Sequence, residues 1–171
     1  MSLSLQGSVA VQVTIRYTNP LDLSTPVDNL SRKNQVDYSS GTGQNQADRL
    51  WHDTRVVSGT NNDDINMLAL TDSLGQTIAP ARLRSMTIKA SDTNSNNLLV
   101  VCSVTNGWLG PFGAAMSSGF ALQPGQIFNW TLGNSLGWAV TSGAGTLRVK
   151  QTAVASNSPA SYDIILVGAS V

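Results

Sequence analysis

The segment SVAVQVTIRY, residues 8–17, decides how the rest of the chain is interpreted. Apolar side chains occupy every second position from Val9 to Tyr17, and polar or small residues stand between them. Because successive side chains of a β-strand point to opposite faces, this alternation predicts a strand with one apolar face. The chain therefore begins with a β pattern.

Strand patterns continue along the chain, separated by Gly, Pro and Asn turns such as QPGQ and SGAG. One of them, NLLVVCSV at 97–104, is apolar on both faces, which is typical of a central strand. Short strands at this spacing predict an all-β fold, a β-sandwich or jelly roll of about eight or more strands. The other segments are DRLWHDTRVV (48–57), RLRSMTIKA (82–90), QIFNWTL (126–132), GWAVT (137–141), TLRVKQT (146–152) and SYDIILVG (161–168).

The composition agrees with this fold class. Charged residues make up 12% of the 171 residues, about half the usual share, and Ser, Thr, Asn and Gly replace the residues that build exposed helices. Ten basic and ten acidic residues give a net charge of +0, and the basic residues are scattered. We expect no nucleic-acid partner and no attraction to an anionic membrane.

The length predicts a single domain over residues 1–171. Within it, residues 18–46 have weak periodicity and two prolines, and a loop of that length is uncommon in a compact domain. Apolar residues are spaced along it, so we interpret 18–46 as an extended arm or loop. It either packs on its own subunit or reaches a neighbour; the candidate interface residues here are Leu21, Leu23, Val27, Leu30 and Tyr38.

The single cysteine, Cys102, lies in an apolar run and is interpreted as a small buried hydrophobe. The first residues have neither a basic start nor an unbroken apolar stretch, and no apolar run approaches the ~20 residues of a membrane span. We expect a protein that assembles in a cytoplasm without disulfides and does not enter a membrane.

The segment NQADRLWHDTR, 45–55, holds the only histidine, His52, next to Asp53. A general base needs its acid across space, whereas neighbours on a strand point to opposite faces. Asp53 therefore cannot orient His52. Asp53 and Arg55 are possible partners on one face, and we expect His52 to be half-buried. The sequence predicts that the protein is not an enzyme.

Cofactor and metal motifs are also missing from the sequence. One histidine and one cysteine cannot build a usual zinc site. The segment SDTNSNN, 91–97, resembles the start of a calcium loop but lacks its glycine and glutamate, so it is interpreted as a polar hairpin turn, and NNDD, 61–64, as another turn. The glycine-rich GTG and GAG lack phosphate-loop spacing. We expect no cofactor.

Two aromatic residues, Trp108 and Phe112, lie in the Gly- and Pro-rich loop NGWLGPFG. If they are exposed, they mark a binding surface for a protein or a sugar ring. If they are tucked under the loop, they cap the sandwich. Both alternatives remain open at this stage, and both residues are candidate interface residues. Trp51, Trp130 and Trp138 lie in strand patterns and are expected in the core.

Several segments, taken in order, resemble a family of small structural proteins of tailed bacteriophages that is associated with the major capsid protein. They are LDLSTPV, GTGQNQADRLWHDTR, LTDSLGQTIAPARLRSMTI, LQPGQIF, GWAVTSGAGTLRV and SYDIILVGAS. The resemblance covers nearly the whole chain and rests on the order and spacing of these segments. It implies a β-sandwich or jelly-roll protein that decorates or cements the outside of a phage head, with no catalytic residues.

The expected function is therefore that of a virion protein on the capsid exterior, assembled in the host cytoplasm. It would bridge neighbouring major capsid protein subunits as a homo-oligomer, with a homotrimer favoured by the threefold geometry of such lattices. The alternative is a jelly-roll module that binds carbohydrate on a host surface, with Trp108 or Trp138 as the stacking platform.

Overall fold

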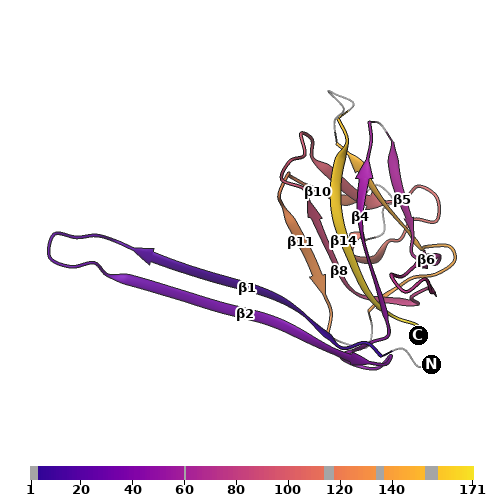
Figure 1. The fold of residues 1–171 in the computed structure, drawn as a ribbon, viewed down its shortest axis with the longest axis horizontal. Coiled ribbons are helices and arrows are strands. Elements are labelled where there is room, and N and C mark those ends of the chain that lie inside the picture. The colour runs from indigo at the N-terminus through magenta and orange to yellow at the C-terminus, as the bar shows by residue number, and fades with distance from the viewer. Residues whose placement is uncertain (1–3, 60, 114–117, 134–136, 153–157) are drawn as a thin grey trace.

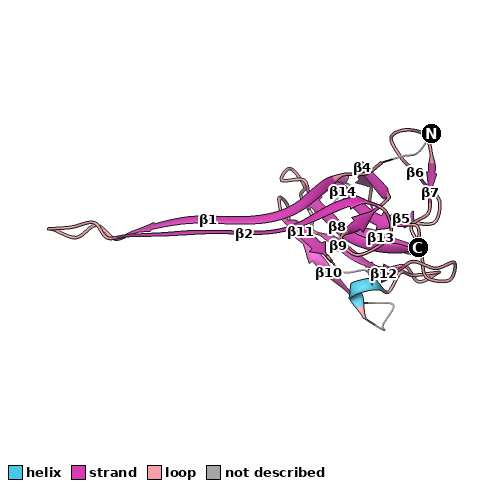
Figure 2. Ribbon diagram, turned by 90° about the horizontal axis from the view of Figure 1, so that it is seen from below, coloured by secondary structure: helices cyan, strands magenta, loops and turns pink. Residues whose placement is uncertain are grey.

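The computed structural model describes residues 4–59, 61–113, 118–133, 137–152 and 158–171. Two antiparallel sheets pack face to face, and a long two-stranded ribbon leaves one end of this sandwich (Figures 1 and 2). Helix within these ranges is limited to a 3-10 turn, η1 (Gly110–Phe112), so no described helix is long and apolar enough to cross a membrane.

The first sheet has the strand order β11-β8-β14-β4, with the short β12 also paired to β8. Much of its inward face is apolar: Met86 and Ile88 of β8 and Ile164 of β14 are completely buried. The strand bounds are β4 (Arg49–Val57), β8 (Arg82–Ala90), β11 (Ile127–Thr131), β12 (Trp138–Ala139) and β14 (Ala160–Ala169).

The second sheet has the order β10-β9-β13-β5. Its strand β9 lies between β10 and β13 and is buried on both faces, as its continuous apolar sequence predicted. The bounds are β5 (Asn62–Asn66), β9 (Leu98–Cys102), β10 (Gly119–Leu122) and β13 (Thr146–Gln151). A separate pair, β6 (Leu70–Thr71) with β7 (Thr77–Ile78), lies between β5 and β8 in the chain.

The chain changes sheet between nearly every pair of consecutive long strands. Among the long described strands of the sandwich, β9 and β10 are the consecutive pair that stays within one sheet, where they lie directly antiparallel. With the short β12 set aside, two sheets of four strands connected in this way form a jelly roll, so the predicted all-β class is confirmed. The sandwich core is one apolar cluster drawn from both sheets and from Trp108.

The remaining strands form the ribbon, which we call the arm. Strand β1 (Gly7–Thr18) pairs antiparallel with β2 (Val27–Ser40) along its whole length, and the short β3 (Gln46–Ala47) runs parallel to the base of β2. The 12 residues of β1 span about 40 Å. The structure refines two predictions here. Residues 8–17 form a strand, but it lies outside the sandwich, and within the predicted arm or loop of 18–46 the residues Val27–Ser40 form the second strand of the ribbon.

Candidate interaction surface

The arm has two chemically different faces. Residues directly opposite each other in an antiparallel pair share a face, so the pairing of Ile15 with Leu30 fixes which side chains lie together. One face, the arm stripe, carries the apolar residues; the other carries Ser8, Gln12, Thr14, Arg16, Lys33, Gln35 and Asp37. The apolar members of the arm stripe are Val9, Val11, Val13, Ile15, Tyr17, Leu30 and Val36.

Most of the arm stripe is exposed to solvent. Its apolar side chains from Val11 outward are between 41% and 68% exposed, with Leu30 the lowest and Tyr17 the highest. A row of exposed apolar side chains of this kind is a candidate contact site. The regular alternation that predicted a strand at residues 8–17 therefore describes a face that the single chain leaves uncovered.

The tip of the arm is closed by two backbone hydrogen bonds. The amide of Asn19 donates to the carbonyl of Pro26 at 3.2 Å, and the amide of Leu21 donates to the carbonyl of Ser24 at 2.8 Å. This turn leaves Leu21 56% and Leu23 fully exposed. Two of the candidate interface residues thus form an apolar knob at the far end of the arm.

The root of the arm is fixed to the sandwich by Tyr38. This side chain is buried in a small cluster with Ala47 and Val167, against which Val9 and Val36 pack. Its hydroxyl donates to the carbonyl of Leu132 at 2.8 Å. Burial raises the pKa of Tyr38 to about 12, although the charge of Arg84 acts in the opposite direction. Tyr38 was predicted as a candidate interface residue. Because its side chain is buried, it instead anchors the arm to the sandwich.

The segment that connects the arm to β4 is held equally firmly. The guanidinium of Arg84, itself buried, donates to the carbonyls of Thr42 at 2.8 Å and Gly43 at 3.3 Å. Beyond this segment, the carboxylate of Asp48 accepts hydrogen bonds from the amide and hydroxyl of Ser170, at 2.9 and 2.6 Å. The arm therefore projects from a clamped base, and its direction is set by the sandwich.

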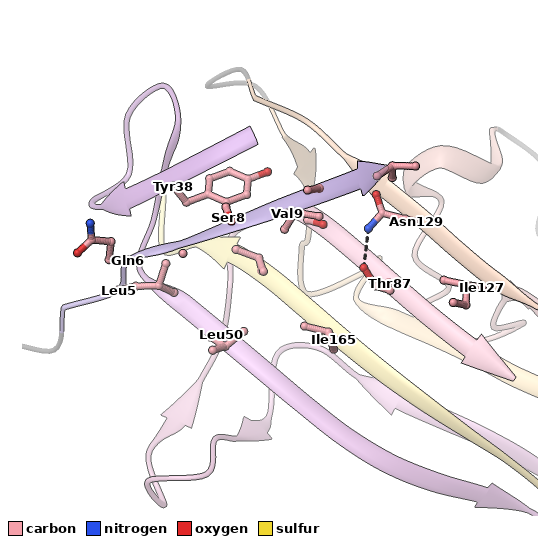
Figure 3. A pocket seen from close by; sticks show the side chains of 15 residues that line it. Leu5, Gln6, Ser8, Val9, Tyr38, Leu50, Thr87, Ile127, Asn129 and Ile165 are labelled. Atoms are coloured by element: carbon pink, nitrogen blue, oxygen red, sulfur yellow. Dashed lines mark hydrogen bonds between the residues drawn. The ribbon is translucent and has the colours of Figure 1, made fainter. Parts of the chain in front are cut away.

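A groove of about 790 Å³ opens between the root of the arm and the outer face of the first sheet (Figure 3). Leu50, Ile127 and Ile165 on that outer face are 43–60% exposed. The groove is also lined by Leu5, which precedes the arm, and by Val9 and Val11 of the arm stripe. The uncovered apolar surface is therefore an L-shaped corner, with one side on the sheet and the other along the arm.

The outward face of β4 also carries His52, which is exposed rather than half-buried as predicted. It lies opposite Ile165 of β14, with no acid on that rung. The pairing predicted for Asp53 is confirmed, since Arg55 Nη1 lies 3.0 Å from Asp53 Oδ2. Strand alternation separates the two neighbours, so His52 and Asp53 do not act together.

Arg55 makes its main contact with Asp63 of β5. Its Nε and Nη2 donate to the two carboxylate oxygens at 2.6 and 2.7 Å, and the hydroxyl of Tyr162 adds a third hydrogen bond at 2.6 Å. Burial favours a higher pKa for Asp63, but the bonds from Arg55 and Tyr162 outweigh it and hold the pKa below its usual value. The group joins the two sheets. The NNDD segment is therefore the start of a strand, not the predicted turn.

The aromatic loop residues lie against the sandwich. Trp108 is completely buried and its indole nitrogen donates to the carbonyl of Ala139 at 2.9 Å. Phe112 meets it edge to face at a centroid distance of 6.0 Å and is only partly buried. The second of the two alternatives holds: the loop lies over the end of the core. Trp108 is therefore a core residue, and not the candidate contact residue or sugar platform that was predicted. Trp138 is partly exposed.

The remaining polar candidates also hold the fold together. Asn94 of the calcium-like segment exchanges two hydrogen bonds of 2.8 Å with the backbone of Ser161. The segment connects strands of different sheets, so it is a bridge rather than the expected hairpin turn. Burial raises the pKa of the Cys102 thiol. The described part of the chain contains no cluster of three His, Cys, Asp or Glu side chains placed to hold a metal ion.

Comparisons with known proteins give one structural neighbour. No family model matches the sequence, and no curated protein matches it. A chain of the cyanophage Pam1 capsid asymmetric unit is similar over 68% of this chain and 84% of that chain, with 17% sequence identity and a TM-score of 0.25.

Proposed function

We propose that this protein is a structural component of a bacteriophage virion that binds the capsid exterior and bridges neighbouring major capsid protein subunits. The observation that carries the proposal is the arm: a ribbon of about 40 Å, clamped at its root, with an apolar stripe that the single chain leaves exposed. The resemblance of the sequence to phage head proteins supplies the identity of the shell.

The arm is suited to bridging because it adds contact area far from the jelly roll at little cost in folded mass. Its direction is fixed by Tyr38 and Arg84, so a neighbour can be reached without the entropy cost of ordering a mobile loop. The L-shaped corner at the root provides a second apolar contact on the same side. Two contacts on one rigid body favour simultaneous binding to two subunits.

The rest of the surface suits a protein present in many copies. A net charge of +0 gives no long-range attraction to the packaged DNA. His52 lies opposite an isoleucine and the polar groups of Asp63 and Asn94 are used within the fold, so the proposal includes no catalytic step. We further propose a homotrimer at positions of local threefold symmetry on the shell.

The test shortens the arm at a matched rung. Because Val11 pairs with Asn34, removing residues 12–33 and joining the ends with an Asn-Gly turn keeps the root cluster intact. We expect this variant to keep the circular dichroism spectrum and melting temperature of the jelly roll but to lose co-sedimentation with capsid shells.

A second pair of variants separates arm length from arm chemistry. Val13→Thr with Ile15→Thr makes the arm stripe polar while keeping β-branched side chains, and Gln12→Thr with Arg16→Thr alters the opposite face to the same extent. The first pair should weaken shell binding and the second should not. Full shell binding by the shortened variant would refute the proposal.

A further inference from the structure

The arm stripe carries two charges among its apolar residues. Asp28 pairs with Tyr17 and Arg32 pairs with Val13, one rung on either side of Ile15 and Leu30. Both charged residues are exposed, and neither forms an ion pair with another described residue. Along the stripe from root to tip, Arg32 is positive, Leu30 is apolar and Asp28 is negative.

This pattern of charges is complementary to that of a second arm that runs in the opposite direction. If a second arm lies face to face on the first, running antiparallel about a twofold axis at the Ile15–Leu30 rung, β1 lies over β1 and β2 over β2. Arg32 of each copy then meets Asp28 of the other, and Leu30 meets Leu30. We propose that two copies of this protein associate through their arms in this antiparallel, twofold arrangement.

The other ways of stacking two arms fit less well. With the arms parallel, β1 of one copy lies over β2 of the other, so Arg32 faces Val13 and Asp28 faces Tyr17. Both charges would then lose water without gaining a partner, which is unfavourable. The opposite faces cannot pack together, because they carry Arg16, Lys33 and amide side chains in place of apolar ones.

The same symmetry brings the tip of one arm to the root of the other. Reversal about the central rung places residues 21–23 over positions 7–9 of the partner's β1. Leu21 and Leu23 are the exposed knob of the tip, and the apolar groove opens beside Gly7, Val9 and Val11. A single register therefore pairs the charges and brings the exposed leucines to the mouth of the groove.

The size of this contact sets its strength. Five residues of each strand face the partner, so each arm offers a patch of about 30 by 10 Å, and the pair buries about 600 Å². Stable complexes usually bury at least about 1,200 Å². The association is therefore expected in the micromolar range or weaker for purified protein. On a shell, if the proposed function holds, the twofold pairing would link copies of two different trimers.

Charge reversal on purified full-length protein tests the register. Arg32→Asp alone and Asp28→Arg alone each place like charges opposite one another twice, and either should weaken dimerisation at least about tenfold in sedimentation equilibrium. The double variant Asp28→Arg with Arg32→Asp should restore it. An equimolar mixture of the two single variants should also associate, because the charges then match between unlike chains.

Crosslinking tests which face is covered. Facing sheets lie about 10 Å apart, which a disulfide cannot span, so Leu30→Cys should be joined by a short bis-maleimide rather than by oxidation. Ser31→Cys, exposed on the opposite face, is the control. The native Cys102 is buried and does not compete. We expect crosslinked dimer from Leu30→Cys only.

Two results would overturn the inference. One is a wild-type protein that stays monomeric up to about 1 mM, and the other is dimerisation that the single charge reversals leave unchanged. Either result would leave the proposed binding to the capsid shell intact, because that proposal is tested by co-sedimentation with shells and this one by the purified protein alone.

Discussion

Two neighbouring aspartates of β5 allow a matched test of what holds the sheets together. Asp63 and Asp64 each receive two hydrogen bonds from an arginine, with nearly equal lengths of 2.6 and 2.7 Å for Asp63 and 2.6 and 2.6 Å for Asp64. Their surroundings differ: the side chain of Asp63 is 12% exposed and that of Asp64 is 42% exposed. The free energy of unfolding should therefore respond very differently to Asp63→Ala and Asp64→Ala.

The magnitude follows from what each truncation leaves behind. Asp63→Ala removes three hydrogen bonds and leaves the hydroxyl of Tyr162, a residue 1% exposed, without its acceptor, which alone costs about 1–3 kcal/mol. Water can still reach Arg55, whose side chain is 31% exposed, so the total falls short of a fully buried pair, at about 3 kcal/mol. Asp64→Ala breaks a pair with Arg148 whose carboxylate is 42% exposed, and it leaves no buried hydroxyl without an acceptor, so it should cost about 1 kcal/mol or less.

The assay is urea denaturation of both variants followed by circular dichroism, with melting temperature as a second measure. For a chain of 171 residues, the loss at Asp63 corresponds to a fall of about 6–12 °C. In a Tyr162→Phe background the cost of Asp63→Ala should shrink by about 1 kcal/mol, because no hydroxyl is stranded. Equal costs at the two aspartates, or a larger cost at Asp64, would refute the reasoning.

Three further predictions concern Asp63, Tyr38 and Trp108. Folding lowers the pKa of Asp63, so its contribution to the free energy of unfolding is complete above the unfolded pKa of about 3.9 and is lost as pH falls through the folded pKa. The difference in stability between wild type and Asp63→Asn, measured by urea titration, should therefore shrink only at strongly acidic pH. Spectrophotometric titration should show a tyrosine near pH 12 that disappears in Tyr38→Phe, and this variant should also lose about 1 kcal/mol of stability and amide-exchange protection at the arm root. Trp108→Ala should cost about 3–5 kcal/mol and leave the exposed arm stripe unchanged, and a folded, fully stable variant would contradict the core position of this residue.

The sequence predicted the jelly roll because its strands carry their own signal. Alternation around Met86 and Ile88 and the doubly apolar β9 were enough to predict strands and a sandwich, and the structure confirms both. Strand β2 gave no such signal. Its face on the stripe alternates apolar residues with Asp28, Arg32 and Asn34, and its strand conformation comes from pairing with β1. The alternation of apolar and polar residues is weak in a strand whose conformation depends on pairing with its neighbour.

The site was harder to predict because its residues are defined by distant partners. Asp63 looked like a turn residue until Arg55 and Tyr162 were placed beside it from two other strands. Tyr38 was a candidate contact residue because of its place in the arm, and Trp108 because of its place in a Gly- and Pro-rich loop, but each is buried by segments far along the chain. Leu21, Leu23, Val27 and Leu30 are exposed on the arm, as a contact surface requires.

The clamped root has a practical meaning for anyone who wishes to attach a label or an antigen to this molecule. Leu5 packs beside Tyr38, and Ser170 binds Asp48, so the first and last described residues both sit where the ribbon leaves the sandwich. Cargo fused to either end would crowd that junction. The Gln123–Gln126 turn that leads into β11 lies at the opposite end of the sandwich and offers the better insertion point (Figure 1).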